Sequence, residues 1–157
     1  MKTLIVYYSR SGTTKTVAEI LAKELKADLE EIIDKTNRSG IFRYLIAGMD
    51  AIKRKLTSIE PLKKDAKKYQ LIIIGMPIWV GTIPPAIRTY LKDNSLENKK
   101  VALLITCGGK EEQEKKIIDE IKKITPKANI ISSLTIRKKH INYAENKIKE
   151  WKKNLKF

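Results

Sequence analysis

The sequence predicts an α/β protein with a doubly wound, five-stranded parallel sheet and helices on both faces. Five short apolar runs recur along the 157 residues, and turn residues bound each of them. Between these runs lie segments whose apolar residues recur every three or four positions, which is the spacing of an amphipathic helix. The runs are nearly continuous in Ile, Leu and Val, as expected for strands buried on both faces of a parallel sheet. Strands that alternate with helices favour an open parallel sheet.

The expected strands are spread along the whole chain. They are Leu4–Tyr8, Leu29–Ile33, Leu71–Ile74, Val101–Ile105 and Ile130–Ile136. The second of them is the weakest signal. No linker rich in Gly, Pro or Ser divides the sequence, so we expect residues 1–157 to form a single domain.

Five helical segments are expected between and after these strands. Their apolar stripes run from Val17 to Leu25, Ile41 to Leu56, Pro84 to Leu91, Ile117 to Ile124 and Ile141 to Leu155. Proline is tolerated in a first turn, so Pro84 and Pro85 can start the third helix. The stretch Arg43–Lys55 is amphipathic and basic, and we expect its apolar side to face the core. A role for this helix as a lid or a partner surface stays open.

A hydroxyl-rich turn, Ser9–Thr14, joins the first expected strand to the first expected helix. A helix N-terminus exposes unpaired N–H groups and carries partial positive charge. The Ser and Thr hydroxyls add donors, and Gly12 lets the backbone approach a ligand closely. These features suit a phosphate group. The alternative is purely structural, because Ser and Thr are also ordinary helix-capping residues.

Two other strand ends carry unusual loops, Pro77–Thr82 and Thr106–Gly109. Ligands of open parallel sheets bind beyond the carboxyl ends of the strands, so these loops are expected to meet the hydroxyl-rich turn. Trp79 would be covered by stacking on a flat aromatic ligand or, alternatively, by packing against a helix. Gly81 either presents its backbone to a ligand or simply allows a turn.

Together these segments resemble the flavodoxin family. The residues that match its first signature are Ile5, Val6, Tyr7, Ser9, Gly12, Thr14, Ala18 and Leu21. Pro77–Gly81 is similar to the family loop that flanks one face of the flavin, and Thr106–Gly109 stands where the family has its second flavin loop. The likeness covers nearly the whole chain and fits the short-chain form, because no insertion interrupts the fifth strand. It implies the strand order 2-1-3-4-5.

The resemblance implies flavin mononucleotide (FMN) as the cofactor. The phosphate would be wrapped by Ser9, Arg10, Ser11, Gly12, Thr13 and Thr14. Trp79 would stack on the isoalloxazine, and Gly81 would offer its backbone near flavin N5. The other residues expected to contact the flavin are Pro77, Ile78, Val80, Thr106, Cys107, Gly108 and Gly109.

Two departures from the family bear on function. The loop Thr106–Gly109 carries no aromatic residue, which leaves one flavin face open to a substrate, a partner protein or a second subunit in a homodimer. The chain also has 33 basic and 18 acidic residues and a net charge of +15, whereas typical flavodoxins are acidic. We therefore expect acidic redox partners.

Composition narrows the other classes of function. The lysines are spread along helical segments without interleaved aromatics, which favours a solvated surface over nucleic-acid binding. The single cysteine, Cys107, cannot form an intrachain disulfide and fits a reducing cytoplasm. No apolar segment approaches the ~20 residues of a membrane span. No residue set has metal-ligand spacing, no catalytic residue is assigned, and His140 is expected at the surface or in a cap.

Three functions remain open at this stage. The leading one is an electron carrier that shuttles electrons between redox partners, because the chain is short and shows no second substrate pocket. The first alternative is an NAD(P)H-dependent flavin or quinone reductase, which the open flavin face and the lysines support. The second is a non-redox scaffold that binds acidic partners. Fold alone does not decide among them.

Overall fold

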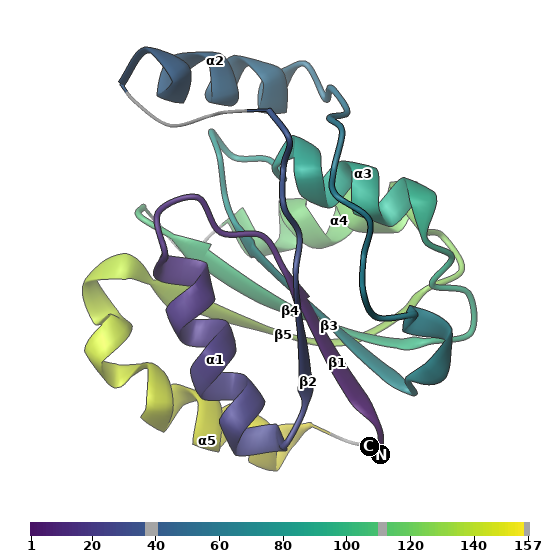
Figure 1. The fold of residues 1–157 in the computed structure, drawn as a ribbon. Coiled ribbons are helices and arrows are strands. Elements are labelled where there is room, and N and C mark those ends of the chain that lie inside the picture. Colours follow the sequence, from purple (N-terminus) through teal and green to yellow (C-terminus); the bar gives the residue numbers. More distant parts are fainter. Residues whose placement is uncertain (37–40, 110–112, 156–157) are drawn as a thin grey trace.

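The fold is built on one five-stranded parallel sheet. The computed structural model describes residues 1–36, 41–109 and 113–155. The strands are β1 (Thr3–Tyr7), β2 (Asp28–Glu31), β3 (Leu71–Pro77), β4 (Lys100–Cys107) and β5 (Asn129–Arg137). They lie in the order β2-β1-β3-β4-β5 (Figure 1), so the predicted fold class and strand order are confirmed.

The central strands of the sheet are almost completely buried. All five residues of β1 are buried, as are the first six of β3. Val6 pairs with Ile74 across β1 and β3, and Ile74 pairs with Leu103 across β3 and β4. The continuous Ile, Leu and Val runs reflect this position, because side chains from both strand faces enter a core.

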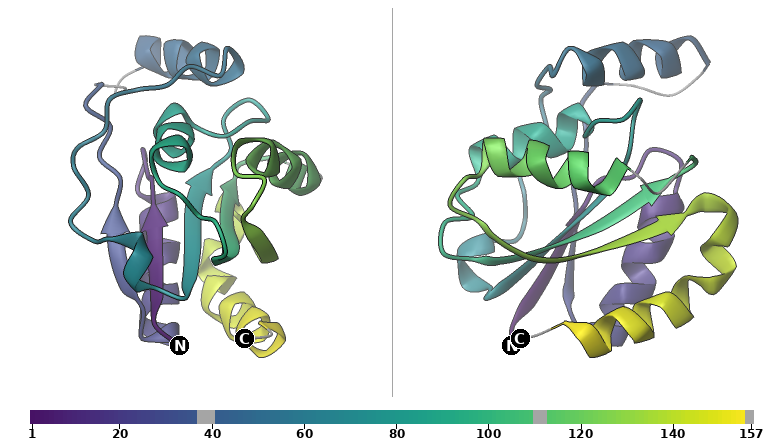
Figure 2. Two further views of the ribbon diagram at one scale, coloured as in Figure 1. Left: turned by 90° about the vertical axis from the view of Figure 1, so that its right-hand side faces the viewer. Right: turned by 180° about the vertical axis from the view of Figure 1, so that it is seen from behind.

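Helices cover both faces of the sheet. They are α1 (Thr13–Leu25), α2 (Ile41–Ile52), α3 (Pro85–Asp93), α4 (Glu114–Ile124) and α5 (Ala144–Asn154), with short 3₁₀ segments η1 (Ala66–Lys68) and η3 (Lys138–Tyr143). α1 and α5 lie on one face, and α3 and α4 lie on the other (Figures 1 and 2). Among the described residues, no helix is both long enough and apolar enough to cross a membrane.

Each face of the sheet has its own apolar core. On the α1 and α5 side, Ile5 and Ile73 pack with Leu21, Ile148 and Trp151. On the α3 and α4 side, the second core contains Val6, Ile74, Ile87, Ile117 and Ile121. Alternate residues of β1 and β3 therefore serve opposite cores, which fixes the strand register.

Helix α2 does not pack as its sequence predicts. Leu45, Met49, Ile52 and Leu56 are between 48 and 63% exposed, so the expected core-facing stripe is wrong. The helix lies beyond the carboxyl ends of the strands, away from both helix layers (Figures 1 and 2). Of the α2 side chains that the structure describes, which exclude Ile41 of the expected stripe, Ala47 and Ala51 are the buried ones. Small residues face the body here because α2 approaches the turn after β3 closely: a Cβ on Gly48 would lie 3.0 Å from Val80 Cγ2.

The other boundaries differ by a few residues from those expected. The third helix starts at Pro85, with Pro84 as its N-cap in extended conformation. The last helix starts at Ala144 and follows η3, inside which His140 adopts a non-helical backbone. His140 is half-buried within η3, and the N-cap of α5 is Tyr143. The five expected strands and five expected helices are otherwise all present.

Candidate functional site

Three loops meet at the carboxyl edge of the sheet, as the sequence predicts. They follow β1, β3 and β4 and enclose a cavity of about 220 Å³. Its lining residues are Arg10, Ser11, Thr13, Thr14, Pro77, Ile78, Trp79, Thr106, Cys107, Gly108 and Lys138. All of them except Lys138 belong to the candidate set named from the sequence. The convergence follows from parallel pairing, which brings the ends of β1, β3 and β4 side by side.

The turn before α1 has unused hydrogen-bonding capacity. Gly12 is the N-cap of α1 with φ of 88°, a left-handed conformation that glycine adopts without strain, and no side chain caps the helix there. Gly12 itself therefore offers no side-chain acceptor to the N–H groups of the first turn. Ser9 Oγ is buried and has no hydrogen-bond partner among the described residues. Both features are expected of a turn that receives a hydrogen-bonding anion.

A buried hydrogen bond joins this turn to β4. Thr14 Oγ1 and Thr106 Oγ1 lie 2.8 Å apart, and the two residues are 1% and 2% exposed. The contact spans α1 and β4 across the intervening strand β3. It holds the hydroxyl-rich turn in register with the loop after β4, which forms the opposite wall of the cavity.

The loop after β3 closes into a tight turn. Trp79 N–H donates to Thr82 O at 3.0 Å, and Thr82 N–H donates to Trp79 O at 3.1 Å. Val80 and Gly81, the two central residues, have φ of 48° and 75°, which identifies a type I′ turn. A β-branched residue is strained in this region, so the backbone of Val80 is held there by its surroundings.

The indole of Trp79 forms part of the cavity wall. Its ring meets the ring of Tyr8 edge-on, with centroids 5.6 Å apart and an interplanar angle of 73°. The guanidinium carbon of Arg10 lies 5.8 Å from the Trp79 ring centroid. Trp79 is half-buried against the α3 and α4 core. The α3 and α4 core thus covers part of the Trp79 ring, and another part of the ring lines the cavity.

Some predicted residues lie around the cavity rather than along its wall. Ser9, Gly12, Gly81 and Gly109 do not line it, and Val80 lines a second cavity on the other side of the turn. Lys138, which directly follows β5, lines the cavity although it was not predicted from the sequence. Its position at the carboxyl end of a strand is the sequence feature that marks it.

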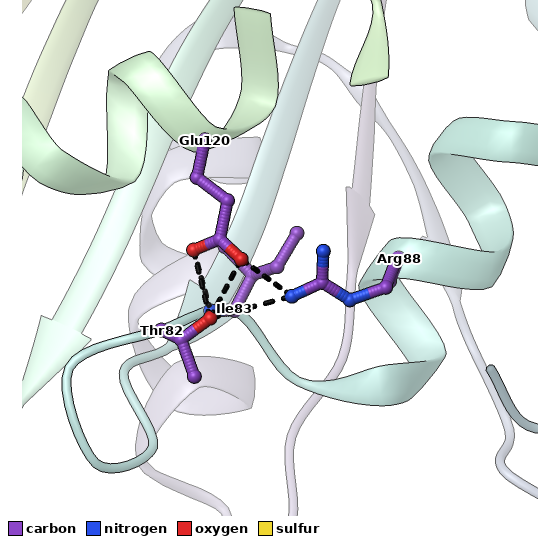
Figure 3. Close-up of polar contacts among 4 residues, drawn as sticks. All are labelled: Thr82, Ile83, Arg88 and Glu120. Carbon is purple, nitrogen blue, oxygen red and sulfur yellow. Dashed lines mark hydrogen bonds and ion pairs between the residues drawn. The ribbon is translucent and has the colours of Figure 1, made fainter. Parts of the chain in front are cut away.

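A buried polar network fixes the 79–82 turn to the helices behind it (Figure 3). Arg88 Nη2, from α3, donates to Glu120 Oε1 of α4 at 2.5 Å, and their side chains are 5 and 10% exposed. Thr82 Oγ1 donates to Glu120 at 2.7 Å, and the N–H of Ile83 approaches Oε2 at 3.4 Å. No local sequence pattern predicts this pair, because its members are 32 residues apart.

The network also sets the protonation of Glu120. Burial favours the neutral carboxyl, but the hydrogen bonds from Arg88 and Thr82 and the charge of Arg88 outweigh it, so the pKa of Glu120 is lowered. The carboxylate is therefore charged at neutral pH. In the part of the chain that the structure describes, no group of three or more His, Cys, Asp or Glu could hold a metal ion.

Comparison with known proteins agrees with this geometry. Residues 2–155 match the family model described as flavodoxin. No curated protein matches the sequence. Among solved structures, the chain is similar to a flavoprotein from Lactobacillus acidophilus in complex with FMN, at 28% identity and a TM-score of 0.72, with 96% of this chain and 98% of that chain covered.

Two further solved structures share the fold. One is a candidate flavoprotein from Bacteroides eggerthii, with 24% identity and a TM-score of 0.80, covering 98% of this chain and 97% of that chain. The other is oxidised flavodoxin 2 from Bacillus cereus, with 21% identity and a TM-score of 0.60, covering 99% and 100% of the two chains.

Replacing Glu120 with Gln is expected to lower the free energy of unfolding by about 3 kcal/mol at neutral pH, because Arg88 loses its buried counter-charge. The pKa of Glu120 is lower in the folded protein than its ordinary value of 4.5. The pair therefore contributes fully above pH 4.5, and its contribution is lost as the pH falls through the folded pKa. Urea unfolding of the wild type and E120Q across this range measures the difference.

The matched control is Glu97→Gln. Glu97 pairs with Lys127 at 2.8 Å, but the side chains are 45 and 72% exposed. Its loss is expected to cost less than about 1 kcal/mol. Equal costs for the two substitutions would contradict a structural role for the buried pair.

Proposed function

The chain belongs to the flavodoxin family, and from that premise we propose that it binds FMN at the carboxyl edge of the sheet and carries electrons between redox partner proteins. The family match covers nearly the whole chain. The Lactobacillus acidophilus relative, whose structure is a complex with FMN, supports the choice of cofactor. The single observation that carries the assignment is the buried, unpartnered hydroxyl of Ser9 in a turn that opens a helix.

The turn Ser9–Thr14 fits the phosphate group. A phosphate brings several acceptor oxygens, and the turn offers hydroxyl groups, the N–H groups at the start of α1 and the cation of Arg10. Ser9 Oγ gains the partner that the protein does not provide. Gly12 leaves open space around its Cα, since a Cβ built there would meet nothing within 4 Å.

The remaining walls fit a flat ring. Trp79 stands on one side of the cavity, and Thr106, Cys107 and Gly108 stand on the other. The cavity of about 220 Å³ is smaller than the ~300 Å³ at the lower end for drug-sized ligands. The flavin ring would therefore project beyond it, between the 79–82 turn and the loop after β4, with an edge open to a partner.

Bound FMN would supply the redox chemistry, and the residues of the chain would bind and orient it and control access. The second candidate is an NAD(P)H-dependent reductase. It is favoured by the loop after β4, where Gly108 and Gly109 are exposed and Thr106–Gly109 contains no aromatic residue.

We expect FMN to bind about one to one and much more tightly than riboflavin, because riboflavin lacks the phosphate that the turn would hold. Ser9→Ala is expected to weaken FMN binding roughly tenfold and to leave riboflavin binding unchanged, since it removes one charge-assisted hydrogen bond. Titration of the apoprotein with both ligands measures this. Ser95→Ala, at an exposed serine after α3, is the control. Equal affinities for the two ligands would rule out a phosphate role for the turn.

Trp79→Ala is expected to weaken FMN binding by on the order of 1 kcal/mol and to restore flavin fluorescence that the wild type quenches, because ring stacking is lost. Steady-state fluorescence during titration gives both quantities. The control is Trp151→Phe, since Trp151 lies in the α1 and α5 core and donates to Ser132 Oγ at 2.8 Å. Unchanged affinity and unchanged quenching in W79A would reduce Trp79 to a packing residue.

The carrier and the reductase differ in how they take electrons. Anaerobic addition of NADH or NADPH to the FMN-loaded carrier is expected to leave the flavin oxidised, whereas a strong chemical reductant reduces it in two separate one-electron steps. Absorption spectra follow both processes. Rapid and complete reduction by either nicotinamide would instead establish the reductase.

An acidic partner protein is expected to exchange electrons faster than a basic one, because the net charge of +15 steers anionic surfaces toward the molecule. Added salt should erode the difference, since the Debye length falls from ~10 Å at 0.1 M to ~3 Å at 1 M. Stopped-flow rates with an acidic ferredoxin and a basic cytochrome of matched driving force provide the measurement. A basic partner that is faster at low salt would contradict this view of docking.

A further inference from the structure

A second cavity lies on the other side of the 79–82 turn. It has a volume of about 580 Å³ and shares no lining residue with the proposed FMN cavity. Val80 and Thr82 of the turn contribute to its wall, together with residues after α2 and along α3 and α4. A volume of roughly 300–1,000 Å³ is typical of small-molecule sites, so this cavity is large enough for more than an inorganic ion.

The walls of this second cavity are strongly basic. Five basic side chains line it against two acidic ones. One of the acids, Glu120, is already neutralised by its ion pair with Arg88 and by the hydroxyl of Thr82. The other, Asp119, faces Arg54, Lys115, Lys116 and Lys123 around the same space. An excess of positive charge in a concave site focuses the field on an anion.

Two of the lysines occupy a position that helices normally avoid. Lys115 and Lys116 are in the first turn of α4, where the macrodipole already supplies partial positive charge and disfavours a cation. The acidic residue of this turn, Glu114, accepts hydrogen bonds from Ser133 and Thr135 of β5. Lys116 also reaches the 79–82 turn, since its Nζ lies 3.4 Å from the position that a Cβ on Gly81 would take. The helix terminus and the two ammonium groups therefore reinforce one another in attracting an anion.

Arg88 provides a buried donor beside these exposed lysines. The residue is 4% exposed, lines the cavity, and is held in place by Glu120 and Thr82. Its Nε is buried with no partner among the described residues. Figure 3 shows one terminal nitrogen directed at Glu120 and Thr82. The Nε–H group is thus a donor that the described residues leave unused.

We propose that this second cavity binds a phosphate-bearing small molecule next to the 79–82 turn. Lys116 and Lys123 contact the phosphate, and Arg88 orients it from the buried wall. The assignment rests on the proposed function in one respect, that FMN fills the first cavity and leaves the second for another ligand. Since Val80 and Thr82 belong to both the 79–82 turn and the cavity wall, the bound molecule lies against this turn.

Inorganic pyrophosphate is the probe, titrated by calorimetry into FMN-loaded protein in phosphate-free buffer. We expect one site per chain. The double variant Lys116→Gln, Lys123→Gln is expected to weaken it at least about tenfold, because two charge-assisted contacts are lost. The control is Lys122→Gln, Lys153→Gln, which removes the same charge: both lysines are exposed, and neither lines the cavity. This control should change the affinity less than about twofold, as expected for screened surface charges.

Absence of pyrophosphate binding, or an equal loss in the control variant, overturns the proposal, because diffuse surface charge would then explain any effect. Titration with 2′,5′-ADP identifies the source of the phosphate: tighter binding than pyrophosphate indicates a nucleotide, and equal or weaker binding indicates a smaller phosphate compound. Flavin absorbance before each titration checks cofactor loading separately. If no FMN is taken up, the proposed function fails, and the comparison of the two lysine variants still tests this cavity.

Discussion

The buried ion pair between Arg88 and Glu120 is the contact on which the functional end of the molecule depends. The pair joins α3 to α4, and the Glu120 carboxylate accepts a hydrogen bond from the Thr82 hydroxyl. It therefore anchors the turn that separates the two cavities. The turn contains Val80 in a strained left-handed conformation, which needs such an anchor to persist. A buried pair of this kind is costly to desolvate and adds little net stability, but breaking it would leave a charge without a partner. The role of the pair here is to hold the 79–82 turn in position.

The first cavity depends on a different constraint, the parallel order of the central strands. β1, β3 and β4 are neighbours in the sheet, so the three loops that follow them lie side by side at its carboxyl edge. The bond between Thr14 and Thr106 then fixes the separation of the outer two loops. The Ser9 hydroxyl is buried without a partner among the described residues, which is a cost to the folded protein alone, and a phosphate ligand would remove it.

Helix α2 shows how charge and apolar surface are distributed around these cavities. It carries Leu45, Met49 and Ile52 outward, while Ala47 and Ala51 face the body. Its C-terminal end reaches the second cavity through Ile52 and Arg54. The basic residues of the chain are thus concentrated in part around a concave site, which a count of net charge does not reveal.

Most of the fold was determined by local sequence pattern. The Ile, Leu and Val runs specified the buried strands, because only a sheet covered on both faces buries every residue of such a run. The turn Ser9–Thr14 and the loops at Trp79 and Thr106 could be assigned to one edge, since parallel strands end together. Tertiary structure alone decided which side of α2 is buried, because helical periodicity defines an apolar stripe but not what covers it. It also decided the pairing of Arg88 with Glu120 and the position of Lys138 in the wall of the first cavity. Both bring together residues far apart in the sequence, through packing that no local pattern encodes.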